Sequence, residues 1–89
     1  MISVTLVDAD TYAVVVESDT ETEHRVTMSQ AYYRELCGAT VTHEFVIMSA
    51  FRFLLEREPN TAILAAFDLK DINRYFPEFE DEIKSRLDR

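Results

Sequence analysis

The stretch FVIMSAFRFLL, residues 45–55, decides how this chain can fold. Arg52 is its only charged residue. The polar side chains in and just after the stretch, Ser49, Arg52 and Glu56, are spaced so that a helix gathers them on one narrow stripe. A helix that is apolar around most of its circumference is a buried helix. We therefore expect residues 42–57 to form a helix at the centre of the protein.

Two arrangements would bury such a helix in a chain of 89 residues. In the first, a sheet covers one side of the helix and apolar residues of the C-terminal segment cover the other. That segment supplies suitable side chains at Ile63, Leu64, Phe67, Leu69, Ile72 and Phe76. In the second, a homodimer shares the helix containing Phe45–Leu55, since two-fold dimers are the commonest soluble oligomers. The sequence leaves both arrangements open.

Upstream of this helix, residues 1–28 predict an antiparallel β-meander of three strands. The segments 2–7, 12–17 and 23–28 are rich in β-branched residues and alternate apolar with polar side chains. Short turns of Asp, Ser and Thr separate them. Strands joined by such short turns pair with their neighbours in the chain.

Residues 29–89 form the helical part of the predicted fold. A first helix follows Ser29 as N-cap and ends near Gly38. Beyond the central helix, short helices are expected around residues 60–67 and 68–76, and an amphipathic helix ends the chain. The fold class is therefore α+β, a single domain over residues 1–89 with a three-stranded antiparallel β-meander followed by four to five helices.

The charge of the chain bears on its partners. Its net charge is −8, and residues 1–44 hold eight acidic residues against two arginines. Nucleic-acid binders carry a basic face, so this balance argues against nucleic acid as the partner. No apolar run approaches the roughly 18 residues of a membrane helix. The start of the chain has no secretory signal and Cys37 is the only cysteine, so we expect a cytoplasmic protein without a membrane or a disulfide.

Few residues suggest chemistry. His43 and Glu44 begin like a zinc-protease motif, but position 47 is Ile where the second histidine would stand. Cys37 and His43 lie six residues apart without an evident third group to orient them. His24 is expected to be solvated, among charged neighbours. We therefore assign no catalytic, cofactor-binding or metal-binding residue and expect that the protein is not an enzyme.

Two further observations concern charged side chains. The acidic residues of the hairpin ends could converge on a divalent cation, although their spacing matches no calcium loop. They are Asp8, Asp10, Asp19, Glu21 and Glu23. On the helices, the four-residue spacing predicts the ion pairs Arg52–Glu56, Glu80–Lys84 and Glu82–Arg86.

The C-terminal half contains the runs FLLEREPN, IL, FDL and RYFPEFE, beginning at Phe53. In this pattern the chain resembles small uncharacterised bacterial proteins. The resemblance covers most of the chain and implies a shared family without implying an activity.

A second similarity lies in residues 25–57, where a strand, a helix, a glycine-containing turn and a hydroxyl-capped helix follow one another. This layout is similar to ribbon-helix-helix repressors, whose strand pairs with its two-fold mate and enters the DNA major groove. The resemblance implies that Arg25 and Thr27 would be the DNA-binding residues. Here the strand carries a single basic residue and an acid, Glu23, and a hairpin precedes it.

Taken together, these observations favour a small non-enzymatic cytoplasmic interaction or accessory protein that binds another protein. The alternative is a ribbon-helix-helix-type DNA-binding regulator or antitoxin.

Overall fold

The N-terminal part of the chain forms the predicted meander. The computed structural model describes residues 1–88. Strands β1 (Ile2–Asp8), β2 (Thr11–Val16) and β3 (Thr22–Thr27) pair antiparallel in chain order, with a register shift near the end of β1. The side chains of β2 alternate between buried and half-buried, as expected for a strand with one face on the core.

The sheet has a fourth strand that the sequence did not predict. β4 (Ala66–Asp68) lies beside β3 and runs parallel to it, so the sheet is mixed and has the order β1-β2-β3-β4. The prediction of a short helix around residues 60–67 is therefore largely wrong. Only one 3₁₀ turn, η1 (Asn60–Ala62), forms there. The backbone N–H of Arg25 donates to the carbonyl oxygen of Ala65 at 2.7 Å. Pairing with an otherwise open sheet edge outweighs the weak local helix preference of this segment.

The remaining elements are helical. The described residues form four α-helices, namely α1 (Gln30–Cys37), α2 (His43–Leu55), α3 (Ile72–Tyr75) and α4 (Phe79–Leu87), together with a second 3₁₀ turn, η2 (Leu69–Asp71). The predicted caps are confirmed: the hydroxyls of Ser29 and Thr42 accept backbone N–H groups at 3.1 Å. Gly38 ends α1 with a φ of 61°, in the left-handed region that favours glycine.

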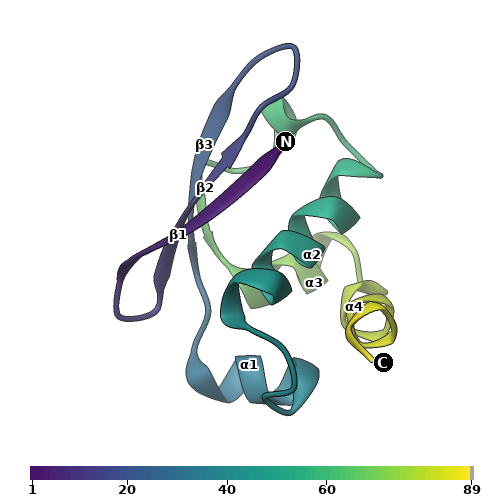
Figure 1. The fold of residues 1–89 in the computed structure, drawn as a ribbon. Coiled ribbons are helices and arrows are strands. Elements are labelled where there is room, and N and C mark those ends of the chain that lie inside the picture. The colour runs from purple at the N-terminus through teal and green to yellow at the C-terminus, as the bar shows by residue number, and fades with distance from the viewer. Residues whose placement is uncertain (89) are drawn as a thin grey trace.

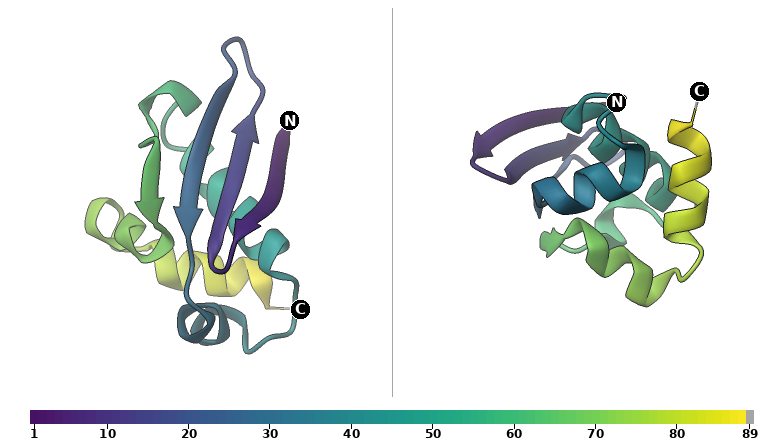
Figure 2. Two further views of the ribbon diagram at one scale, coloured as in Figure 1. Left: turned by 90° about the vertical axis from the view of Figure 1, so that its left-hand side faces the viewer. Right: turned by 90° about the horizontal axis from the view of Figure 1, so that it is seen from below.

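The elements stack in two layers. Figure 1 shows the helices on one side of the sheet, with α2 running along the covered face. Figure 2 (left) shows the sheet face-on, with the helices behind it and the other face uncovered. Along β3 the buried side chains Val26 and His24 point to the helical layer, while Glu23 and Arg25 are exposed.

The central helix is buried within one chain. Seven α2 residues are buried: Val46, Ile47, Ser49, Ala50, Phe51, Phe53 and Leu54. All of them except Ser49 belong to one hydrophobic core cluster that includes residues of β2, β3, α1 and α4. Of the apolar side chains in residues 45–55, only that of Phe45 is exposed, at 36%. The first of the two arrangements is thus the one observed, and burial of α2 does not call for a second chain. A homodimer through the helix containing Phe45–Leu55 stays a prediction.

Charged side chains join α2 to α4 in a way only partly predicted. The expected Glu82–Arg86 pair is present at 3.2 Å. The expected pairing of Glu56 with Arg52 is wrong, because Glu56 lies 2.6 Å from Arg86, and this contact lowers the pKa of Glu56. Glu80 likewise accepts hydrogen bonds from Tyr32 and Asn73 in place of pairing with Lys84. For Glu56 and Glu80, contacts with another helix are thus formed in place of the expected contacts along the same helix.

Candidate functional site

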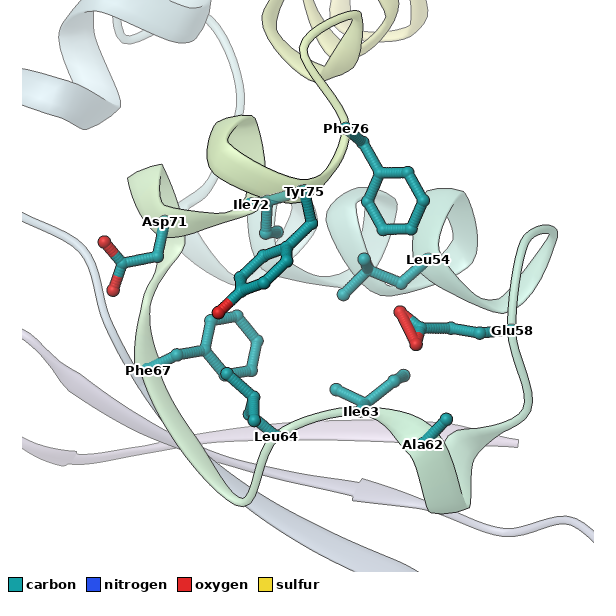
Figure 3. A pocket seen from close by; sticks show the side chains of 10 residues that line it. All are labelled: Leu54, Glu58, Ala62, Ile63, Leu64, Phe67, Asp71, Ile72, Tyr75 and Phe76. Atoms are coloured by element: carbon teal, nitrogen blue, oxygen red, sulfur yellow. The ribbon is translucent and has the colours of Figure 1, made fainter.

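An open apolar pocket lies between the C-terminal end of α2, the short helix α3 and the segment 60–67. It encloses about 220 Å³. Its walls are mainly aliphatic and aromatic, and Figure 3 shows them from close by. The lining residues are Leu54, Glu58, Ala62, Ile63, Leu64, Phe67, Asp71, Ile72, Tyr75 and Phe76. We call this site the α2–α3 pocket.

Asn60 anchors the start of the segment 60–67, which forms one wall of the pocket. Its side chain is 5% exposed. Its Nδ2 donates to the carbonyl oxygen of Thr20 at 2.7 Å and to the hydroxyl of Thr22 at 3.0 Å. A buried amide whose hydrogens are both used holds the chain in one place. Pro59 ends the helical region before it, so the wall begins at a defined point.

His24 fixes the wall from the sheet side. The expectation that it is solvated is wrong, because the side chain is 2% exposed and its ring lies 5.4 Å from the ring of Phe51. Its Nδ1 is 2.8 Å from the carbonyl oxygen of Leu64, and its Nε2 is 2.9 Å from the Thr22 hydroxyl. The two-residue alternation that buries Val26 also buries His24, and this signal could have been followed in the sequence.

The apolar surface continues beyond the pocket. Leu64 is 52% exposed and Tyr75 is 65% exposed, and both line the opening. Phe67 and Phe76 are half-buried beside them. Figure 3 shows the ring of Tyr75 lying across the opening above Phe67. Clustered exposed apolar side chains of this size mark contact sites more often than isolated ones do.

The charged residues of the pocket are both acidic. Glu58 is half-buried, and Figure 3 shows its carboxylate pointing toward the pocket interior. Among residues 1–88 no cation lies within ion-pair distance of it. Asp71 has a structural role, since its Oδ2 accepts the backbone N–H of Asp68 at 3.2 Å and completes a capping box.

The residues suggested for DNA binding lie elsewhere, on the uncovered face of the sheet. The Arg25 guanidinium is 3.6 Å from the carboxylate of Glu23. The Thr27 hydroxyl donates to Asp68 Oδ2 at 3.1 Å. β3 has β2 on one side and β4 on the other, so the strand cannot pair with a two-fold mate as in ribbon-helix-helix proteins. DNA binding stays a prediction. The strand pairing between two chains, on which the resemblance to ribbon-helix-helix repressors depends, is blocked here.

Cys37 and His43 are both held by Tyr33. Cys37 Sγ donates to the carbonyl oxygen of Tyr33 at 3.4 Å. The His43 ring stacks on the Tyr33 ring at 3.7 Å, and its Nε2 lies 3.0 Å from the side-chain oxygen of Gln30. Both side chains thus have structural contacts, and no hydrogen bond joins the two within the described residues.

The acidic hairpin residues do not converge. Asp8 and Asp10 flank the turn between β1 and β2, whereas Asp19 and Glu21 lie in the turn between β2 and β3. These turns are at opposite ends of the sheet (Figure 1). The two groups of acidic side chains are therefore too far apart to share one cation. Within residues 1–88, no three His, Cys, Asp or Glu side chains are grouped as metal ligands.

Comparison with known protein families, with curated proteins and with solved structures finds no match to this chain. Among the described helices, none has the length and apolar character needed to cross a membrane.

Proposed function

We propose that this protein is a small non-enzymatic interaction protein, and that it holds a segment of another protein against the α2–α3 pocket. The proposal includes the cytoplasmic setting expected from the sequence. It is supported by the apolar surface around the pocket, where Leu64 and Tyr75 are 52% and 65% exposed. A protein segment can fill the pocket of about 220 Å³ and also cover the parts of both side chains that extend beyond it.

The chemistry-bearing side chains support the non-enzymatic part of the proposal. His24 is engaged on both ring nitrogens and is buried in the core. Cys37 and His43 contact Tyr33 and lie outside the pocket. The pocket walls themselves are apolar apart from the two carboxylates and the Tyr75 hydroxyl. No Ser, Thr, Cys, Lys or His is among the residues that line the pocket, so a base-activated hydroxyl, thiol or amine nucleophile has no residue there.

The test is selection of peptides from a random displayed library on the full chain, followed by affinity measurement of the selected peptides by fluorescence anisotropy. Leu64→Ser should weaken binding at least fivefold, because it removes an exposed apolar contact. Leu6→Ser is the matched control, since Leu6 is the same residue type at 53% exposure on β1. Equal binding to both variants would contradict the proposal.

A further inference from the structure

We infer that the segment held by the α2–α3 pocket carries a lysine or arginine next to an apolar side chain, and that Glu58 selects the basic residue. This inference rests on the proposed function and names the chemistry of its partner. It starts from the charged residues of the pocket, Glu58 and Asp71, which are both acidic. No basic side chain lines the pocket.

Glu58 differs from the acidic residues around it. The nearest arginine in the chain, Arg57, lies 3.5 Å from Glu56 and 3.4 Å from Glu78, with its guanidinium 3.6 Å above the Phe53 ring. Arg86 likewise binds Glu56 and Glu82. Both arginines thus form their ion pairs with other carboxylates, and neither pairs with Glu58.

Arg52 is the other cation to consider. It shares with Glu58 a neighbouring hollow lined by the start of β1 and by Pro59. The two side chains are not within ion-pair distance in the described part of the chain. Figure 3 shows the Glu58 carboxylate pointing between Leu54 and Ile63, into the α2–α3 pocket.

A half-buried carboxylate beside an apolar wall favours a bound side chain that is both long and positively charged. A Lys or Arg side chain can lay its methylene stem on Leu54, Ile63 and Phe76 while its charged end meets Glu58. The ion pair is stronger there than in bulk water, because the apolar walls lower the local dielectric constant. An adjacent apolar side chain of the same segment would cover Leu64 and Tyr75.

The charge of the whole molecule acts in the same direction. A net charge of −8 attracts basic segments and raises their rate of association. An acidic segment would meet this field and Glu58 together, so it should be rejected. Asp71 adds negative charge at the opening while its Oδ2 stays on the backbone N–H of Asp68.

The experiment repeats the displayed-library selection on four full-length proteins: wild type, Glu58→Gln, Glu58→Lys and Glu35→Lys. Glu35 is an exposed acid on α1, outside the pocket, so Glu35→Lys makes the same change of net charge elsewhere. Wild type and Glu35→Lys should enrich Lys or Arg beside an apolar residue. Glu58→Lys should enrich Asp or Glu at that place. Thermal melting confirms that each variant is folded.

Affinities of one selected synthetic peptide complete the test. Glu58→Gln should weaken its binding about three- to tenfold, and raising the salt concentration should weaken binding to wild type more than to Glu58→Gln. Peptides that lose affinity in Leu64→Ser but show no basic preference would overturn this inference and leave the proposed function standing. Peptides insensitive to Leu64→Ser would overturn both. A dimer in light scattering that Leu64→Ser dissociates would make a second copy of the chain the occupant and would also overturn the inference.

Discussion

His24 and Leu64, 40 residues apart, are joined by a hydrogen bond of 2.8 Å between Nδ1 and the carbonyl oxygen. A carbonyl oxygen only accepts, so the hydrogen lies on Nδ1. The other ring nitrogen lies 2.9 Å from the Thr22 hydroxyl, which in turn accepts the Asn60 amide at 3.0 Å. This chain of contacts fastens the wall of the α2–α3 pocket to the sheet at two points. The pocket is therefore an extension of the core.

His24→Ala should lower the free energy of unfolding by about 2–4 kcal/mol. It removes contacts with Phe51 and leaves the Leu64 carbonyl without this donor. Urea denaturation followed by circular dichroism measures the change. His43→Ala is the matched control, because His43 is half-buried and stacked on Tyr33, and it should cost under about 1 kcal/mol. Similar losses in both variants would show that His24 has no special structural role.

The sequence predicted the elements whose cause is local. The apolar period of residues 45–55, the hydroxyl cap at Thr42 and the glycine at position 38 each act within a few residues, and each is found as expected. The three strands of the meander are also joined by short turns, so their order follows from the chain.

β4 and the pocket could not be predicted in this way. β4 has three residues, and it is a strand because β3, some 40 residues earlier, offers an edge to it. The pocket needs α2, α3 and the 60–67 segment to be placed together, which no spacing within one of them reveals. Apolar side chains such as Leu64 were expected to cover α2, but Leu64, just before β4, is 52% exposed.

Phe51→Ala should lower the free energy of unfolding by about 3–5 kcal/mol, the usual cost of emptying a buried aromatic site. Phe51 is fully buried on α2 between the rings of His24 and Phe67, at 5.4 Å and 6.0 Å. A domain of this size has a total stability of roughly 5–10 kcal/mol, so the variant should melt at a much lower temperature. Phe45→Ala, at an exposed position of the same helix, should cost under about 1 kcal/mol. An unchanged melting temperature for Phe51→Ala would contradict the burial of α2.

Asn60→Asp should be more destabilising than Asn60→Ala at neutral pH. The Asn60 Nδ2 donates to the Thr20 carbonyl and to the Thr22 hydroxyl in a buried place. A carboxylate cannot donate a hydrogen bond. One of its oxygens would lie about 2.7 Å from the Thr20 carbonyl oxygen and repel it, and its charge would be buried. We expect a loss of about 2–3 kcal/mol for Asn60→Ala and more for Asn60→Asp, measured by urea denaturation. Equal stability of Asn60→Asp and wild type would show that the amide donors are not needed.

Tyr32 should make the protein sensitive to high pH. Burial raises the pKa of Tyr32 well above its usual value of 10.0; the hydrogen bond from Asn73 lowers it and the one to Glu80 raises it. The unfolded chain ionises this hydroxyl near pH 10, whereas the folded protein keeps it protonated at higher pH. The stabilisation that Tyr32 contributes is therefore fully present below about pH 10 and is lost as the pH rises above it.

Comparison with Tyr32→Phe isolates this effect, because Tyr12, whose pKa burial also raises, is common to both proteins. At pH 7 the variant should be about 1 kcal/mol less stable, since it loses the hydrogen bonds to Glu80 and from Asn73 at 2.9 Å and 3.1 Å. Between pH 9 and about pH 11 the advantage of the wild type should shrink, because only the wild type gains an ionisable hydroxyl on unfolding at this position. Urea denaturation at a series of pH values gives the difference directly. If the difference in free energy of unfolding stays constant from pH 7 to pH 11, the Tyr32 hydroxyl ionises as readily in the folded protein as in the unfolded chain. That result would contradict its burial between α1 and α4.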